Sequence, residues 1–331
     1  MPIRLYDPFD NLYIDSQTCF LTGDELIGED EKISVFPKWI LDRYSLHDKK
    51  FVMMDQFSSF LYPDVKMPCS FAVIKTALEP LEAEIEEAFT AGYEAVKQLS
   101  EERLFQWMAK MVYGVLYNDL LLETRKSAKR SKEFKLSEPL KKRFKKLHLM
   151  LQSLMVPVEY NGIKPWSISV VKINYSKDVF NYRDEPTNMN FSLGMNGFGI
   201  VACLQDNEVV GRSLQKILDK ISGKTLHPIQ FEELCARFIY TNYLLNYFAD
   251  YKINVREDAV VIEPVPITGS AERPLFAPWN DNMFAQVLAD YWKPWGLTKN
   301  EIYMPPDSPV SYLENDFNYE FISPESIHLP N

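Results

Sequence analysis

The strongest constraint on the fold is a run of helical periodicity in the middle of the chain. Apolar residues recur there at intervals of three and four, the spacing of one helix face. Ser100 and Ser137 are suitable N-caps, and Pro139 follows the second of them at a first-turn position. We therefore expect three helices, at about 78–99, 100–125 and 137–154.

The pattern changes after Pro157, where several short apolar stretches are bounded by glycine and other turn residues. Three of them predict strands, with a glycine-containing hairpin turn within 194–199. Further helices are expected at 211–221, 228–248 and 281–292, and the Pro-rich tail from Tyr303 is expected to lie over the surface. These elements predict an α+β fold with an N-terminal lobe (1–76), a helical segment (77–155) and a mixed C-terminal region (156–331) containing an antiparallel sheet.

Charge is distributed unevenly along the chain. The net charge is −10, yet 125–148 holds eleven Lys or Arg against two Glu. Such asymmetry is typical of a segment that binds an anionic partner. The alternative is that these side chains pair with acidic groups of the same chain or are solvated. The nucleic-acid-binding candidates are Lys129, Arg130, Lys141, Lys142 and Lys145, with His148 expected in solvent among them.

Composition favours a cytoplasmic protein. The four cysteines are far apart in the sequence and do not form a disulfide framework. The first residues lack the apolar run of a signal peptide, and no apolar stretch reaches the roughly 18–20 residues that a membrane helix needs. We therefore expect reduced thiols, no membrane partner and a cytoplasmic location.

Spaced motifs occur between residues 19 and 82. Cys19 begins Cys-Phe-Leu-Thr, with Thr22 at the fourth position. Ile33-Ser34 directly precedes Val-Phe-Pro-Lys-Trp-Ile-Leu. Cys69-Ser precedes Val73-Ile74, and a Leu-x-x-Leu-Glu helix start follows at 78–82.

This arrangement resembles HNH endonuclease-like proteins with a treble-clef zinc site. In that family two cysteine pairs hold Zn²⁺, and a histidine acts on the water that attacks a phosphodiester. The resemblance implies a small ββα lobe in which Cys19, Thr22, Cys69 and Val73 occupy the four ligand positions. Ser34 then occupies the position of the catalytic histidine, and Ile74 that of a family asparagine.

The motif spacing and the flanking residues match the family, but the residues at the ligand and catalytic positions do not. Two of the four ligand positions carry no thiol, and Ser34 cannot act as the general base. We therefore expect no zinc, no other cofactor and no HNH-type cleavage. The alternative is that Cys19 and Cys69 are ordinary buried thiols in an unrelated β-rich lobe.

A second candidate site lies in the C-terminal half. Polar clusters at 181–186 and 204–208 lie beside predicted strands, and Asp184 and Asp206 would supply the oxygen ligands that Mg²⁺ prefers, with Arg183 nearby. The alternative is that these residues form turns and cap strands. His227 and Cys235 are about two helical turns apart, too far for a nucleophile–base pair.

These patterns favour a non-catalytic binding or scaffold protein derived from an HNH-type nuclease, with nucleic acid as the first candidate partner. One alternative is a metal-dependent hydrolase with its site at Arg183, Asp184 and Asp206. Another is a purely structural or protein-interaction role.

Overall fold

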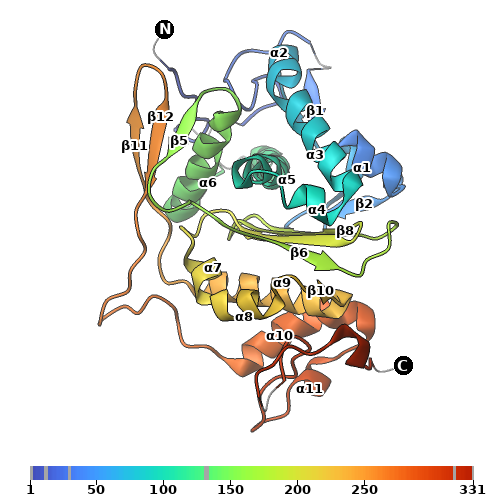
Figure 1. Ribbon diagram of the computed structural model, residues 1–331. Coiled ribbons are helices and arrows are strands. Elements are labelled where there is room, and N and C mark those ends of the chain that lie inside the picture. Colours follow the sequence, from blue (N-terminus) through green and yellow to red (C-terminus); the bar gives the residue numbers. More distant parts are fainter. Residues whose placement is uncertain (1–2, 11–13, 29–30, 130–133, 316–317, 330–331) are drawn as a thin grey trace.

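The computed structural model describes the whole chain except residues 1–2, 11–13, 29–30, 130–133, 316–317 and 330–331. A five-stranded sheet lies between two layers, as Figure 1 shows. The N-terminal lobe and the long helix α5 (Glu101–Lys129) cover one face, and the C-terminal helices cover the other. The α+β class expected from the sequence is confirmed.

The N-terminal lobe contains two small antiparallel ribbons and the start of a twice-interrupted helix that continues into the helical segment. One ribbon pairs β1 with β4, and the other pairs β2 with β3. The elements are β1 (Lys32–Ser34), α1 (Lys38–Arg43), β2 (Lys50–Val52), β3 (Ser59–Leu61), β4 (Lys66–Pro68), α2 (Phe71–Val73), a π-helical stretch (Ile74–Leu78), α3 (Glu79–Ala91) and α4 (Tyr93–Val96).

The helix expected over 78–99 breaks at Gly92. This residue has a φ of 93°, in the left-handed region that favours glycine. It ends α3, and α4 restarts at the next residue. The apolar spacing continues across the break, which explains why periodicity alone predicted one helix.

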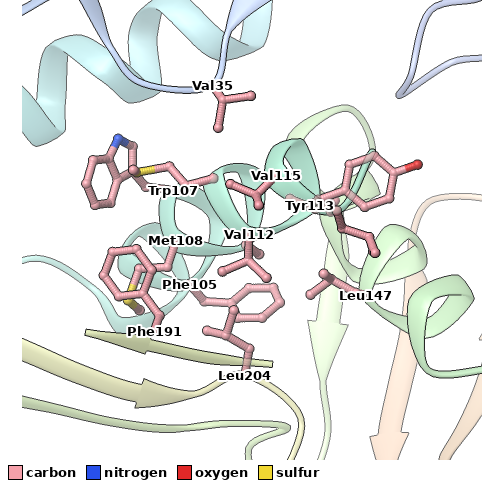
Figure 2. Close-up of a cluster of buried hydrophobic side chains, with 14 of the residues drawn as sticks. Val35, Phe105, Trp107, Met108, Val112, Tyr113, Val115, Leu147, Phe191 and Leu204 are labelled. Carbon is pink, nitrogen blue, oxygen red and sulfur yellow. The ribbon is translucent and has the colours of Figure 1, made fainter. Parts of the chain in front are cut away.

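Helix α5 forms the centre of the first core, and Figure 2 shows apolar side chains around it from several elements. Most of its residues between Leu104 and Leu120 are buried on every side. Gly114 allows the closest approach, because a Cβ at this position would lie 2.4 Å from Cγ2 of Val35. The helix therefore packs directly on the β1–β4 ribbon.

The central sheet follows the order β10-β6-β9-β8-β7 and is antiparallel except where β10 joins β6. The turn between β8 and β9 lies at Asn196 and Gly197, both with positive φ, which confirms the expected hairpin. The strands are β6 (Ser167–Ile173), β7 (Phe180–Glu185), β8 (Asn190–Met195), β9 (Phe198–Cys203) and β10 (Thr225–Leu226).

Successive side chains of each central strand point to opposite faces of the sheet, so the interior contains two hydrophobic clusters. On β9, Phe198 and Ile200 belong to the cluster around α5, whereas Val201 belongs to the cluster beneath the C-terminal helices. The first cluster contains residues from all three parts expected from the sequence, so these parts share one core. The helices on the second face are α7 (Val209–Ser213), α8 (Gln215–Ile221), α9 (Pro228–Leu244), α10 (Asp281–Trp292) and α11 (Lys299–Ile302).

A three-stranded sheet packs beside α6 (Glu138–Leu151), as Figure 1 shows. Its order is β11-β12-β5, with β5 (Val158–Tyr160), β11 (Tyr251–Val255) and β12 (Val260–Pro264).

The C-terminal tail is fixed more firmly than the sequence predicted. The buried carboxylate of Glu233 on α9 accepts hydrogen bonds from the backbone N–H groups of Tyr312 and Leu313, at 2.7 and 3.0 Å. Leu313 is itself buried. This part of the tail is therefore bound to α9 and does not lie loosely over the surface.

Candidate functional site

The residues matched to zinc ligands gather at one end of the β1–β4 ribbon. Phe20 donates its N–H to the carbonyl of Pro68 at 2.9 Å, which brings Cys19 beside Cys69. Ser70 donates its N–H to Cys19 Sγ at 3.5 Å and caps α2 through its own hydroxyl, which accepts from the Val73 N–H. Both cysteines and Val73 are buried.

The two thiols have opposite electrostatic environments. Hydrogen bonding from the Cys69 thiol is the largest of several effects that together lower the pKa of Cys19 to about 5, although burial opposes it. The interaction with Cys19, together with burial, raises the pKa of Cys69. The pair therefore holds a proton on Cys69 and favours a thiolate at Cys19.

This group does not fit a structural zinc site. Such sites use four nitrogen or sulfur ligands. Here Val73 is apolar, and the Thr22 hydroxyl donates to Asp24 at 2.7 Å. Among the residues that the structure describes, no group of three or more His, Cys, Asp or Glu is arranged to hold a metal ion.

A groove of about 820 Å³ lies beside this group, between β1, α1 and the helix that begins with α2. Ser34 and Ile74, the positions matched to the catalytic histidine and asparagine, both line it. Histidine and cysteine are absent from its lining. The lining residues are Lys32, Ile33, Ser34, Pro37, Lys38, Trp39, Asp42, Arg43, Ile74, Glu82 and Glu86.

The acidic groups of the groove differ in how firmly they are held. Glu82 accepts from the buried Lys110 ammonium at 2.6 Å and from the Trp107 indole N–H at 3.1 Å. Asp42 accepts from Lys38 at 2.5 Å and bonds His47 at 2.7 Å, and these two partners, in this order, lower its pKa. Glu82 is therefore held by a buried cation, whereas Asp42 pairs with exposed side chains at the surface.

Two polar atoms in the groove are buried without a partner. The Ser34 hydroxyl oxygen and the Trp39 indole nitrogen have no hydrogen-bond partner within the described part of the chain. Buried polar atoms are nearly always satisfied by protein or water. Two residues that line the groove therefore each hold an unsatisfied polar atom beneath its surface.

The basic candidates on α6 are mostly occupied within the molecule. Lys145 forms ion pairs with Asp7 and with Asp10, the latter at 2.8 Å. Lys141 donates to the Asp10 carbonyl at 3.5 Å. Lys142 and Lys129 form no ion pair with a described residue, and Arg130 lies outside the described residues.

His148 is buried, contrary to expectation. Its Nε2 lies 2.6 Å from the carbonyl oxygen of Phe20, and burial lowers its pKa to about 4. It therefore joins α6 to the loop that carries Cys19. Its spacing of four residues from Phe144 and three from Leu151 places it on the apolar face of the helix, a signal that the neighbouring lysines obscured.

A different group of cations was not predicted from the sequence. Lys32, Lys66 and Arg125 line a cavity of about 230 Å³ between the β1–β4 ribbon and α5. None of the three forms an ion pair with any described residue. They come from three elements far apart in the chain, so no local sequence signal could group them.

The C-terminal candidates do not converge. Because neighbouring residues on a strand point to opposite faces, Arg183 and Asp184 of β7 are directed apart. Arg183 contacts Glu232 at 3.5 Å, on the side of the C-terminal helices. Asp184 interacts with Tyr182, a residue packed against the first core, and burial raises its pKa to about 7.

Asp206 has a structural role. It accepts from the Ser167 hydroxyl at 2.6 Å and from the Val210 N–H at 2.8 Å, at the start of α7. Burial raises its pKa to about 7. His227 likewise caps α9, accepting from the Ile229 N–H at 3.2 Å.

Two further results concern membrane spans and similarity to known proteins. No helix within the described residues is both long and apolar enough to cross a membrane. Comparison with protein-family models, with curated proteins and with solved structures found nothing that matches this chain.

Proposed function

We propose that the chain is a non-catalytic binding protein with an HNH-like N-terminal lobe, and that this lobe contacts nucleic acid. The observation that carries the proposal is the shared position of Ser34 and Ile74 in one groove that lacks histidine. In the HNH-like family, the positions matched by Ser34 and Ile74 belong to the catalytic centre. The lobe thus keeps a binding surface without a general base.

The unpaired cations support an anionic partner. Lys32 lines both the groove and the neighbouring cavity, so it links the groove to Lys66 and Arg125, and none of these three cations forms an ion pair with a described residue. A backbone phosphate neutralised by such groups releases counterions, which makes binding depend steeply on salt. The lysines of α6 contribute less, since Lys145 and Lys141 are used within the molecule.

Fluorescence anisotropy with duplex and single-stranded oligonucleotides tests this proposal. The variant replaces Lys32, Lys66 and Arg125 by glutamine. The salt slope should decrease by about one for each phosphate contact that is lost. The matched control replaces three exposed lysines elsewhere, which gives the same change in net charge: Lys177, Lys216 and Lys293. Absence of binding at low salt, or equal weakening by the control, would contradict the proposal.

The non-catalytic part has its own test. The chain should leave both kinds of oligonucleotide intact in the presence of Mg²⁺, Mn²⁺ or Zn²⁺. Cleavage that co-purifies with the protein and disappears on substitution of Glu82 or Asp42 would show that the groove is catalytic.

A protein-interaction role is the second candidate. The hairpin of β2 and β3 exposes apolar side chains, with Phe57 93% and Val52 52% exposed. Isolated apolar residues are normal on a surface, but grouped ones mark interaction sites. Sedimentation of the wild type and of Phe57→Ser would detect self-association through this hairpin.

A further inference from the structure

Cys19 and Cys69 lie on two segments that one backbone hydrogen bond joins. The Phe20 N–H donates to the Pro68 carbonyl, and Cys19 precedes the donor while Cys69 follows the acceptor. Residues flanking an antiparallel hydrogen bond in this way face each other with Cα atoms about 4.5 Å apart. The 3.5 Å contact between Cys19 Sγ and the Ser70 N–H directs the sulfur toward Cys69.

This separation suits a disulfide, whose Cα atoms are usually about 4.4–6.8 Å apart. Both side chains are buried, so the folded protein shields each sulfur from the thiols of other protein molecules. The nearest reaction partner of an oxidised Cys19 is therefore Cys69. The Ser70 N–H donates to the Cys19 sulfur, which favours Cys19 as the attacking atom.

We propose that Cys19 and Cys69 are a modification site that forms a reversible disulfide on exposure to hydrogen peroxide. The Cys19 thiolate attacks one peroxide oxygen, the O–O bond breaks, and the departing hydroxide takes up a proton to become water. The product is a sulfenic acid on Cys19. The Cys69 sulfur then attacks the Cys19 sulfur, the S–O bond breaks and a second water leaves. Two thiols are oxidised to one disulfide, and one peroxide is reduced to two waters.

The disulfide would join the loop at Cys19 to the start of α2. It encloses the first helix and both ribbons of the lobe in one covalent loop. Such a loop restricts the unfolded chain more than the folded one, so oxidation should raise the unfolding temperature. A dithiol reductant should reverse this shift.

The experiment treats the full-length protein with hydrogen peroxide, alkylates the remaining thiols under denaturing conditions and maps the peptides by mass spectrometry. Two of the four thiols should be lost, with one cross-linked peptide pair containing Cys19 and Cys69. Dithiothreitol should restore all four thiols. Circular dichroism before and after oxidation verifies that the protein stays folded.

Matched variants distinguish this pair from the other cysteines. Cys69→Ser keeps a hydrogen-bond donor beside Cys19, so it should remove the cross-link and leave Cys19 as a sulfenic acid that a dimedone probe labels. The control that replaces both Cys203 and Cys235 by alanine should keep the cross-link. Retention of all four thiols, a cross-link that includes Cys203 or Cys235, or irreversible oxidation of Cys19 beside a free Cys69 would overturn the proposal.

Discussion

Replacing Asp119 by asparagine should stabilise the protein at neutral pH and leave it almost unchanged in acid. One oxygen of this buried carboxyl accepts the Met54 N–H at 3.1 Å, and the other has no partner among the described residues. Burial, with smaller contributions from Asp55 and Glu123, raises its pKa from 3.8 to about 6. A shift of this size corresponds to about 3 kcal/mol.

The direction of the effect follows from linkage. Because the folded-state pKa is raised, the folded protein holds a proton that the unfolded chain releases. The resulting stability is complete below about pH 4 and is lost as the pH rises through about 6. Asparagine has the shape of the protonated acid and keeps the bond from Met54. At pH 8 the variant should therefore be more stable than the wild type by up to about 3 kcal/mol. The charge of Asp119 also helps to raise the pKa of Asp184. Removing that charge should therefore add to the stability gained at pH 8.

Urea unfolding of both proteins between pH 4 and pH 8 measures this difference. Asp307→Asn, at an exposed position, controls for the change in net charge. A variant that is no more stable than the wild type at pH 8 would refute the reasoning. So would an advantage that persists unchanged at pH 4.

Three further predictions concern packing and ion pairs. Gly114→Ala should destabilise the protein by about 1–2 kcal/mol in urea unfolding, because overpacking against Val35 outweighs the better helix propensity of alanine; Val35→Ala should relieve most of this cost. Glu233→Ala should make the segment around Leu313 sensitive to limited proteolysis and lower stability by about 3 kcal/mol, since it removes a buried, paired charge. Lys145→Gln should leave oligonucleotide binding unchanged and alter stability by less than about 1 kcal/mol, because its ion pairs are partly exposed.

Helix positions were predictable where periodicity and caps agreed. α6 begins directly after the expected cap Ser137, and α10 has the bounds predicted for it. β7 was missed for a physical reason. Its alternation is short: Phe180 and Tyr182 face the first core, but Asp184 follows them on that face, and the opposite face is polar throughout. Two apolar residues are too few to give a clear period-two signal.

Only those parts of the candidate site whose residues belong to the spaced motifs were predictable from the sequence. The meeting of Cys19 with Cys69, and of Ser34 with Ile74, follows from positions that the resemblance had grouped. The cations of the neighbouring cavity could not be grouped, since their approach depends on how α5 packs on the ribbon. The pairing of Lys145 with the N-terminal aspartates depends on the same long-range packing.

The packing of α5 explains how a lobe of this kind can fold on hydrophobic contacts. In treble-clef modules, metal–thiolate bonds hold together a segment too small to build its own core. Here the Tyr113 ring packs 5.9 Å from the Phe20 ring, beside the Cys19 loop, and Lys110 pairs with Glu82 on the helix of the lobe. Val73, which the proposed resemblance matches to a ligand position, is buried. Because α5 supplies this core from outside residues 19–82, the lobe and the long helix must fold together, and a fragment that ends before α5 would lack the contacts that order it.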